Sequence, residues 1–192
     1  MNVQGTGASS AGIGRAPYFP CWAQGFEDAL EYKFQSDVTV HNLGLGGWNS
    51  YDGLLNAEGK LDKYQPDLFV LAFGMNDAPH GKSVKEYKDN LQGMIDIVRT
   101  ANPAAEVIII STTNRNIDMV WENNAVRHAD YLPAVYELAE ENENVAVCDM
   151  TAFTDSLFQY KASYECFYNN INHPIDYMVR AYVANMMKLF LR

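Results

Sequence analysis

The sequence predicts an α/β fold with a parallel β-sheet, and three observations lead to that prediction. Short runs rich in β-branched residues alternate with longer segments of helical periodicity. Two of these runs are almost continuously apolar, as strands covered on both faces usually are. The chain has 192 residues, of which 48% are hydrophobic and 20% charged, and no repeat or linker divides it. We therefore expect a single domain over residues 1–192.

Four strands are expected, each from a run of apolar and β-branched residues. The first and last runs are short, V-T-V-H and V-A-V-C. The two between them, D-L-F-V-L-A-F and V-I-I-I-S-T, are the nearly continuous apolar runs. The predicted strands cover residues 38–41, 67–73, 107–112 and 145–148.

Helical patterns lie before and between these strands. Trp22, Phe26 and Leu30 recur at intervals of four, and the tetrapeptide S-V-K-E has the form of a capping box ahead of an apolar stripe. Four helices are predicted, beginning near Trp22, at residues 83–86, at residues 132–133 and near Asp176. We assign their apolar stripes to the core, because packing is the common role of apolar residues at helical spacing.

Composition excludes several classes of function. The formal net charge is −10 with no basic stripe, which disfavours nucleic acid and anionic membranes as partners. No apolar run is long enough for a membrane span. Cys21, Cys148 and Cys166 are odd in number and widely separated, so we expect neither a disulfide framework nor a zinc site. Reduced thiols, and the lack of a basic-then-apolar signal segment, favour a cytoplasmic location.

Polar and glycine-rich loops follow the predicted strands. In open parallel sheets, ligands bind at the carboxyl ends of the strands, so these loops are where a site is expected. The informative loops are residues 42–50, 74–80 and 113–116, together with residues 169–174 ahead of the last helix.

Three side chains or backbone groups in these loops suit acyl-transfer chemistry. Glycines in N-L-G-L-G-G-W-N-S can turn a bare N–H toward a ligand, Asn76 in G-M-N-D can donate from its amide, and His173 ahead of Pro174 can act as a base. Each feature alone is equally compatible with a plain turn or a helix entry. The glycines do not form a dinucleotide fingerprint, and the chain has no phosphate-binding loop of the kind a flavin or signalling module would need.

Together, the three loops resemble the blocks of the SGNH/GDSL hydrolase family of serine esterases and acyl hydrolases. G-L-G-G-W-N-S resembles its second block, G-M-N-D its third, and I-N-H-P the last. The resemblance covers nearly the whole chain and implies a flavodoxin-like three-layer α/β/α fold. It also implies that Gly47 and Asn76 form the oxyanion hole and that His173 is the general base. Asp77 is expected to make hydrogen bonds that order its loop.

The chain departs from the family at the residue that orients the histidine. The family's acid lies three residues before the histidine, and Asn170 occupies that position here. A carboxamide can orient an imidazole but offers it no negative charge. A Ser-His dyad, with a backbone carbonyl orienting the ring, is an alternative. Asp176 lies three residues after the histidine, where a helix cap is its expected role.

The second departure concerns the nucleophile. The family opens with an apolar strand and Gly-Asp-Ser, often followed by Thr-x-Gly-x-Gly-Ala-Ser. Aligning Gly5 and Gly7 to that continuation places Met1 on the serine. The first central strand is then expected to be missing, as in an N-terminal truncation of a working esterase. Ser9 and Ser10 are expected in the loop past the nucleophile.

These observations predict a serine ester hydrolase that is inactive, or nearly so, as this chain alone. The substrate implied by the resemblance is a small acyl ester, such as an acetyl group on carbohydrate, and no metal or organic cofactor is implied. Trp48 and His80 are candidate walls of the substrate site. His128 and His41 are expected to be solvated or locally bonded. The alternative function is a non-catalytic protein of the same fold that binds a carbohydrate or acyl ligand.

Overall fold

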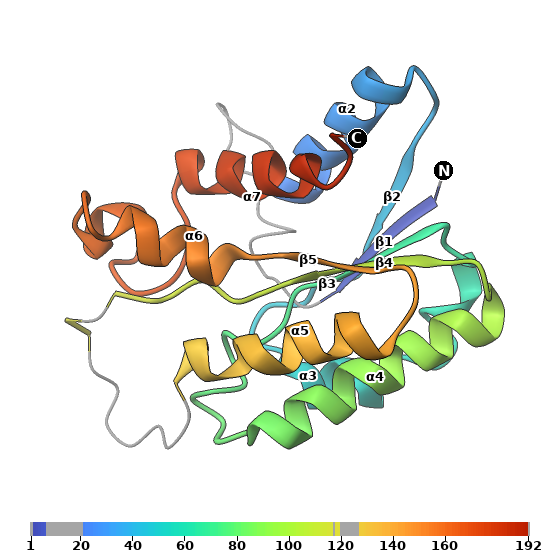
Figure 1. Ribbon diagram of the computed structural model, residues 1–192, viewed down its shortest axis with the longest axis horizontal. Helices are drawn as coiled ribbons and strands as arrows, with labels where there is room; N and C mark the ends of the chain where they lie inside the picture. The colour runs from blue at the N-terminus through green and yellow to red at the C-terminus, as the bar shows by residue number, and fades with distance from the viewer. Residues whose placement is uncertain (1, 7–20, 117, 120–126, 192) are drawn as a thin grey trace.

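The computed structural model describes residues 2–6, 21–116, 118–119 and 127–191. A five-stranded parallel sheet in the order β2-β1-β3-β4-β5 forms its middle layer. Helices α2 and α7 lie on one side of the sheet, and helices α3, α4 and α5 lie on the other (Figure 1). The predicted three-layer α/β/α fold with a parallel sheet is confirmed.

The four predicted strands are all present, and their ends agree with the prediction to within two residues. Their bounds are Thr39–Asn42 (β2), Leu68–Leu71 (β3), Glu106–Ile110 (β4) and Val145–Cys148 (β5). The predicted runs of β3 and β4 extend two residues past the ends of the strands. These residues, Ala72, Phe73, Ser111 and Thr112, stay buried as the chain turns into the following loops. All four residues of β3 are buried, as its unbroken apolar run predicts.

The expectation that the first central strand is missing is wrong. Strand β1 (Asn2–Thr6) lies between β2 and β3 and pairs with both. Its sequence, N-V-Q-G-T, is too polar to be recognised as a central strand. The pairing has a physical reason. An empty central position would leave the buried N–H and C=O groups of both neighbouring strands without partners, and this costs more free energy than placing a strand of polar sequence there.

The four predicted helices are also present, together with two short ones. Their bounds are Trp22–Phe34 (α2), Val84–Ala101 (α4), Leu132–Glu141 (α5) and Asp176–Lys188 (α7). The predicted capping box is present: Ser83 accepts from the backbone of Glu86, and the Glu86 side chain accepts from Ser83. The helices not predicted are Ser50–Leu55 (α3) and Met150–Leu157 (α6), which are short and begin at capping side chains of Asn49 and Asp149. Short 3-10 helices cover Asp62–Tyr64 (η1), His128–Tyr131 (η2) and Ser163–Cys166 (η3).

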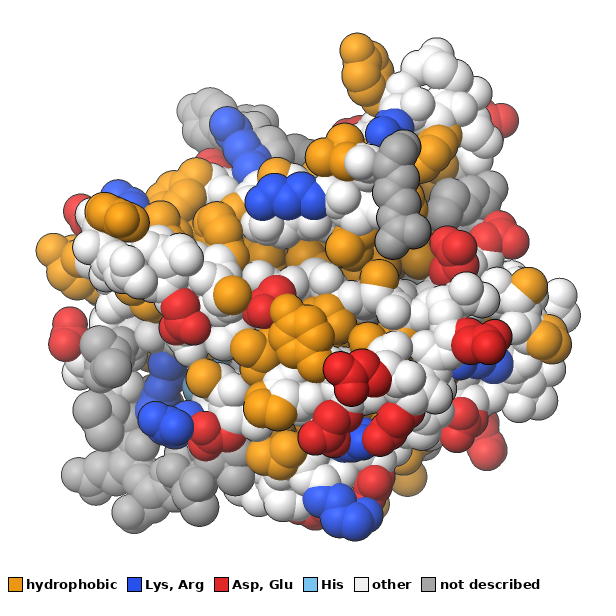
Figure 2. Space-filling view, viewed as in Figure 1, with side chains coloured by type: hydrophobic (Ala, Val, Ile, Leu, Met, Phe, Trp, Pro, Cys, Tyr) orange, Lys and Arg blue, Asp and Glu red, His pale blue; other side chains and the backbone are white. Residues whose placement is uncertain are grey.

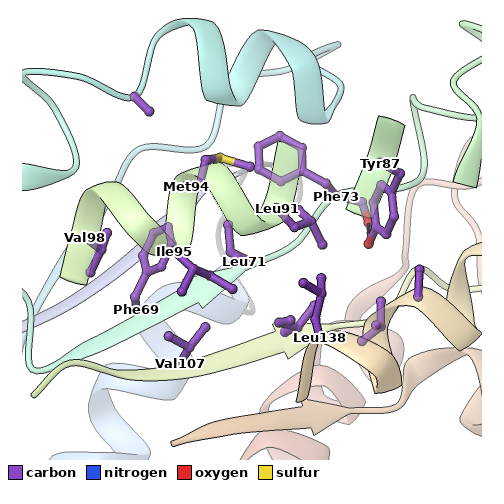
Figure 3. Packing of buried hydrophobic residues seen from close by; sticks show 14 of the residues in the cluster. Phe69, Leu71, Phe73, Tyr87, Leu91, Met94, Ile95, Val98, Val107 and Leu138 are labelled. Atoms are coloured by element: carbon purple, nitrogen blue, oxygen red, sulfur yellow. Dashed lines mark hydrogen bonds between the residues drawn. The ribbon is translucent and has the colours of Figure 1, made fainter. Parts of the chain in front are cut away.

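Alternate residues of the central strands face two separate cores. Phe69 and Leu71 of β3 point toward α4 and α5, whereas Leu68 and Val70 point toward α2 and α7. Figure 3 shows the first core, in which side chains of α4 interdigitate with those of β3 and β4. Its labelled members are Phe69, Leu71, Phe73, Tyr87, Leu91, Met94, Ile95, Val98, Val107 and Leu138. The two cores hold the sheet rigid, so the loops at its edge start from fixed points.

The outer surface is mixed. Figure 2 shows apolar side chains across the middle of one face, over the edge strand β5 and the helices beside it, with charged side chains below them. Lys88 of α4 bonds Glu137 and Glu141 of α5, at 2.8 Å each. Within the described residues, no helix combines the length and apolarity needed to cross a membrane. All three cysteines are free thiols.

Candidate active site

The carboxyl ends of all five strands lie at one edge of the sheet. The register pairs Thr6 with Leu71, Leu71 with Ile109, and Ile110 with Cys148, so parallel strands end side by side. The loops that leave this edge include residues 42–50 after β2, 74–80 after β3 and 113–116 after β4. Three of the loops singled out in the sequence therefore start from neighbouring points, as the parallel sheet requires.

The loops that hold Gly47 and Asn76 are in direct contact. Asn76 Nδ2 donates to the Trp48 carbonyl at 2.9 Å, so the amide lies beside the residue that follows Gly47. An amide nitrogen carries two hydrogens, and this bond uses one of them. Gly47 is exposed and has φ +83°, a backbone conformation that L side chains rarely adopt. The loops that carry the two predicted oxyanion donors are therefore in contact, and the role of these two groups as donors stays a prediction.

The buried side chain of Asp77 connects these two loops. It accepts from the Ser50 amide at 3.0 Å, from the Ser50 hydroxyl at 2.5 Å and from the Gly74 amide at 2.9 Å. Burial raises the pKa of the Asp77 carboxyl, and the bonds from Ser50 and Gly74 act in the opposite direction. Asn90 of α4 donates to the Ser50 hydroxyl at 2.9 Å. The expected ordering role of Asp77 is confirmed.

The loop after β4 joins this region to the His173 loop. A Cβ added to Gly74 would lie 3.0 Å from Thr112 Cβ, so the loop after β3 packs directly on the end of β4. Farther along, the Asn116 amide donates to the Ile171 carbonyl at 2.8 Å, and Asn116 Nδ2 donates to the Asn170 carbonyl at 2.7 Å. The His173 loop thus belongs to the same edge of the sheet as the oxyanion loops. That the side chains of His173 and Asn76 lie close enough to act on one substrate stays a prediction.

His173 is half-buried, and its ring has a defined partner. Its Nδ1 lies 2.9 Å from the Tyr168 hydroxyl. The hydroxyl therefore occupies the position on Nδ1 that the acid of a catalytic triad would occupy. Asn170, at the family's acid position, is exposed with φ 59° and contributes its backbone carbonyl to Asn116. A role for the Asn170 side chain therefore stays a prediction. Tyr168 was not identified from the sequence, because the bond depends on how the chain folds back at this point.

Trp48 and His80 lie on the two oxyanion loops. Trp48 is half-buried and lines a cavity of about 230 Å³ with apolar neighbours that include Leu43, Leu45 and Leu61. Lys60 also lines this cavity, and its Nζ lies 5.4 Å from the centre of the Trp48 ring. His80 is exposed, and its Nδ1 donates to the Asn76 carbonyl at 2.6 Å. Both residues therefore stand next to the proposed donors.

His128 is part of this edge, contrary to the expectation of a solvated or locally bonded side chain. It is buried, and its Nε2 donates to the Met75 carbonyl at 3.1 Å, across 53 residues of sequence. The expectation failed because the residue's polar sequence neighbours do not reveal a bond to a distant loop. Burial lowers the pKa of His128, and the nearby Arg115 lowers it further.

This lowered pKa predicts a pH-dependent stability. Because the folded state disfavours the charged ring, the contribution of His128 is fully present above its unfolded pKa of about 6.5 and is lost as the pH falls through the folded value. We expect the free energy of unfolding, measured in urea at pH 7.5 and pH 5, to fall less for His128→Gln than for the unmodified protein. The control is His80→Gln, which changes an exposed histidine. An equal fall in His128→Gln and the unmodified protein would contradict this assignment.

Among the described residues, no group of three or more His, Cys, Asp or Glu side chains is arranged to hold a metal ion. What the edge does present is an exposed glycine, a side-chain amide and an imidazole. Such groups can stabilise a developing oxyanion and move a proton.

Comparison with known proteins identifies relatives of the whole domain. Residues 3–175 match the GDSL-like Lipase/Acylhydrolase family. An arylesterase from Vibrio mimicus is 29% identical over 136 residues, which make up 71% of this chain. The chain matches only 63% of the length of that relative.

Solved structures with low sequence identity share the fold. A GDSL-like protein from Parabacteroides merdae superposes with a TM-score of 0.82 at 16% identity, over 97% of this chain and 94% of the other. The acetylxylan esterase Axe2 from Geobacillus stearothermophilus gives a TM-score of 0.76 at 17% identity, over 100% of this chain and 92% of the other. The family match covers most of the sequence, including all three loops that resemble its blocks. The chain belongs to the GDSL-like lipase/acylhydrolase family.

Proposed function

We propose that this protein is built for carboxylic ester hydrolysis by a serine mechanism. In that mechanism a serine attacks the ester carbonyl while His173 accepts its proton through Nε2. The Gly47 amide and Asn76 Nδ2, with the amide of the serine itself, stabilise the oxyanion. The observation that carries the proposal is the bond from Asn76 Nδ2 to the Trp48 carbonyl, since it holds the carboxamide beside the exposed glycine.

The proposed substrate is an ester of a small acyl group, such as an acetyl group on carbohydrate. The acetylxylan esterase with the same fold supports this choice of substrate class. The cavity beside Trp48, with its leucines and Lys60, supports Trp48 as a substrate wall, because an aromatic face with polar groups at its rim suits either a sugar ring or a short apolar group.

We also propose that the 192-residue chain turns over esters slowly or not at all. No Gly-Asp-Ser, the motif that carries the family's nucleophile, occurs anywhere in it. Ser9 and Ser10 lie outside the described residues. They follow β1, which ends at Thr6, by only three and four positions. Labelling of either serine by a fluorophosphonate probe in the unaltered chain would overturn this part of the proposal.

The test of the esterase proposal adds a Gly-Asp-Ser motif to the chain. In a chimera, Met1 is replaced by an apolar strand that ends in Gly-Asp-Ser, so that Asn2 directly follows the serine. We expect the added apolar strand to displace residues 2–6 from the central position, because it suits a strand buried on both faces better. The chimera should then hydrolyse p-nitrophenyl acetate and react with a fluorophosphonate.

Asn76→Ala in the chimera should lower kcat by about 100-fold, the usual effect of removing one oxyanion donor. His173→Ala should abolish the fluorophosphonate reaction. Glu140→Ala, an exposed position in the last turn of α5 just before β5 begins, should leave both readouts unchanged. A folded chimera that neither reacts with the probe nor hydrolyses the ester would favour the alternative, a non-catalytic ligand-binding protein. Asn170 at the acid position is the feature that favours this alternative.

A further inference from the structure

The segment that holds His173 folds back on itself as a short hairpin. Cys166 and Ile175 are joined by a backbone bond of 3.1 Å, Phe167 and Pro174 form an antiparallel bridge, and the Tyr168 amide donates to the His173 carbonyl at 2.9 Å. Tyr168 and His173 are therefore neighbours across the hairpin. Their side chains meet for this reason, with ring planes 88° apart.

One carboxamide stabilises the turn of this hairpin. Asn169 Oδ1 accepts from the amides of Ile171, Asn172 and His173 at 3.0, 3.0 and 2.9 Å. Asn116 anchors the same turn to the loop after β4 through its bonds to residues 170 and 171. The backbone at His173 is thus held from both sides.

The Tyr168 hydroxyl contacts the ring itself, and lies 2.9 Å from His173 Nδ1. A neutral imidazole has one N–H and one acceptor nitrogen, and a base acting through Nε2 must carry its proton on Nδ1. A hydroxyl oxygen can accept from Nδ1–H, as the carboxylate of a triad does, but without its negative charge. We propose that Tyr168 is the positioning residue that holds His173 in the tautomer with an unprotonated Nε2, in place of the family's acid. This inference rests on the proposed role of His173 as general base.

The proposal distinguishes Tyr168 from Asn170. Asn170 has φ 59°, and its carbonyl bonds Asn116, so the residue serves the turn through its backbone. Asn170→Gly keeps that conformation available and removes only the carboxamide. Tyr168→Phe removes only the hydroxyl, from a side chain that is 46% exposed. Tyr164→Phe, at a neighbouring exposed tyrosine, is the matched control.

The experiment is long-range ¹H–¹⁵N NMR of the unaltered 192-residue chain and its variants with ¹⁵N-labelled histidine, at a pH where the rings are neutral. The His173 signals are identified among those of the 4 histidines by their loss in His173→Gln. We expect the Nδ1–H tautomer in the unmodified protein, in Asn170→Gly and in Tyr164→Phe. Tyr168→Phe should shift the ring toward the Nε2–H tautomer, which free imidazole side chains of histidine favour.

Three results would overturn the proposal. They are an Nε2–H ring in the unmodified protein, an unchanged ring in Tyr168→Phe, or a shift caused by Asn170→Gly. The spectrum of the unmodified protein gives the first answer without any variant. The NMR experiment measures the tautomer without any turnover of substrate. Its result is therefore independent of the result of the chimera assay. An inactive chimera with the expected tautomer would reject the esterase while leaving the Tyr168–His173 assignment in place.

Discussion

Asp77→Ala is expected to destabilise the protein by about 4 kcal/mol, because it leaves several buried donors without an acceptor. The carboxylate accepts from the Ser50 amide, the Ser50 hydroxyl and the Gly74 amide, and both donor residues are buried. A buried N–H that loses its only partner costs on the order of 1–3 kcal/mol. The hydroxyl can rotate toward another acceptor, whereas the two amides cannot.

The measurement is urea denaturation at pH 7, with Asp62→Ala as the control. Asp62 is an exposed residue of η1, so its removal should change the free energy of unfolding by less than about 0.5 kcal/mol. Equal effects of the two substitutions would mean that the network around Asp77 contributes nothing to stability. A second readout is the side-chain amide signal of Asn76, which should move in Asp77→Ala because the two oxyanion loops lose their link.

Gly74→Ala should cost about 3 kcal/mol, from two causes that act together. Gly74 has φ +114°, where a residue with a Cβ is strained. The added Cβ would also lie 3.0 Å from Thr112 Cβ and 3.2 Å from Thr112 Cγ2. Threonine is β-branched and cannot move these atoms away by a simple rotation, so the loop or the end of β4 must shift.

Gly81→Ala separates the two causes. Gly81 has φ +67° on the same loop, but an added Cβ would have no atom within 4 Å. Its substitution should cost only about 1 kcal/mol, from the backbone conformation alone. Urea denaturation of both variants measures the difference. Equal losses would show that the approach of Gly74 to Thr112 is not tight, and would remove one of the links between the loops after β3 and β4.

Much of the architecture could be predicted from local sequence. The strands at 68–71 and 145–148 and the helices at 84–101 and 176–188 were recognised because their apolar patterns match the period of the element. Helices α3 and α6 were missed because six and eight residues give too short a pattern. Their capping residues, Asn49 and Asp149, were the available signals.

Strand β1 was missed for a different reason. Its five residues have no strand pattern, and only the neighbours on both sides make the position favourable. When a strand forms because of the hydrogen bonds to its neighbours and not because of its own composition, the sequence pattern does not predict it. The same holds for His128 and Tyr168, whose partners depend on how the chain folds back.

The sequence by itself determined the layered α/β architecture and the three loops with their glycine, asparagine and histidine, because periodicity and short motifs are local properties. Only the tertiary structure decided that Asp77 joins two of these loops, that Asn76 bonds the Trp48 carbonyl, and that Tyr168 meets His173. These are contacts between side chains and distant or folded-back backbone. Their existence depends on the register of the sheet and the turn of a hairpin, which no single stretch of sequence specifies.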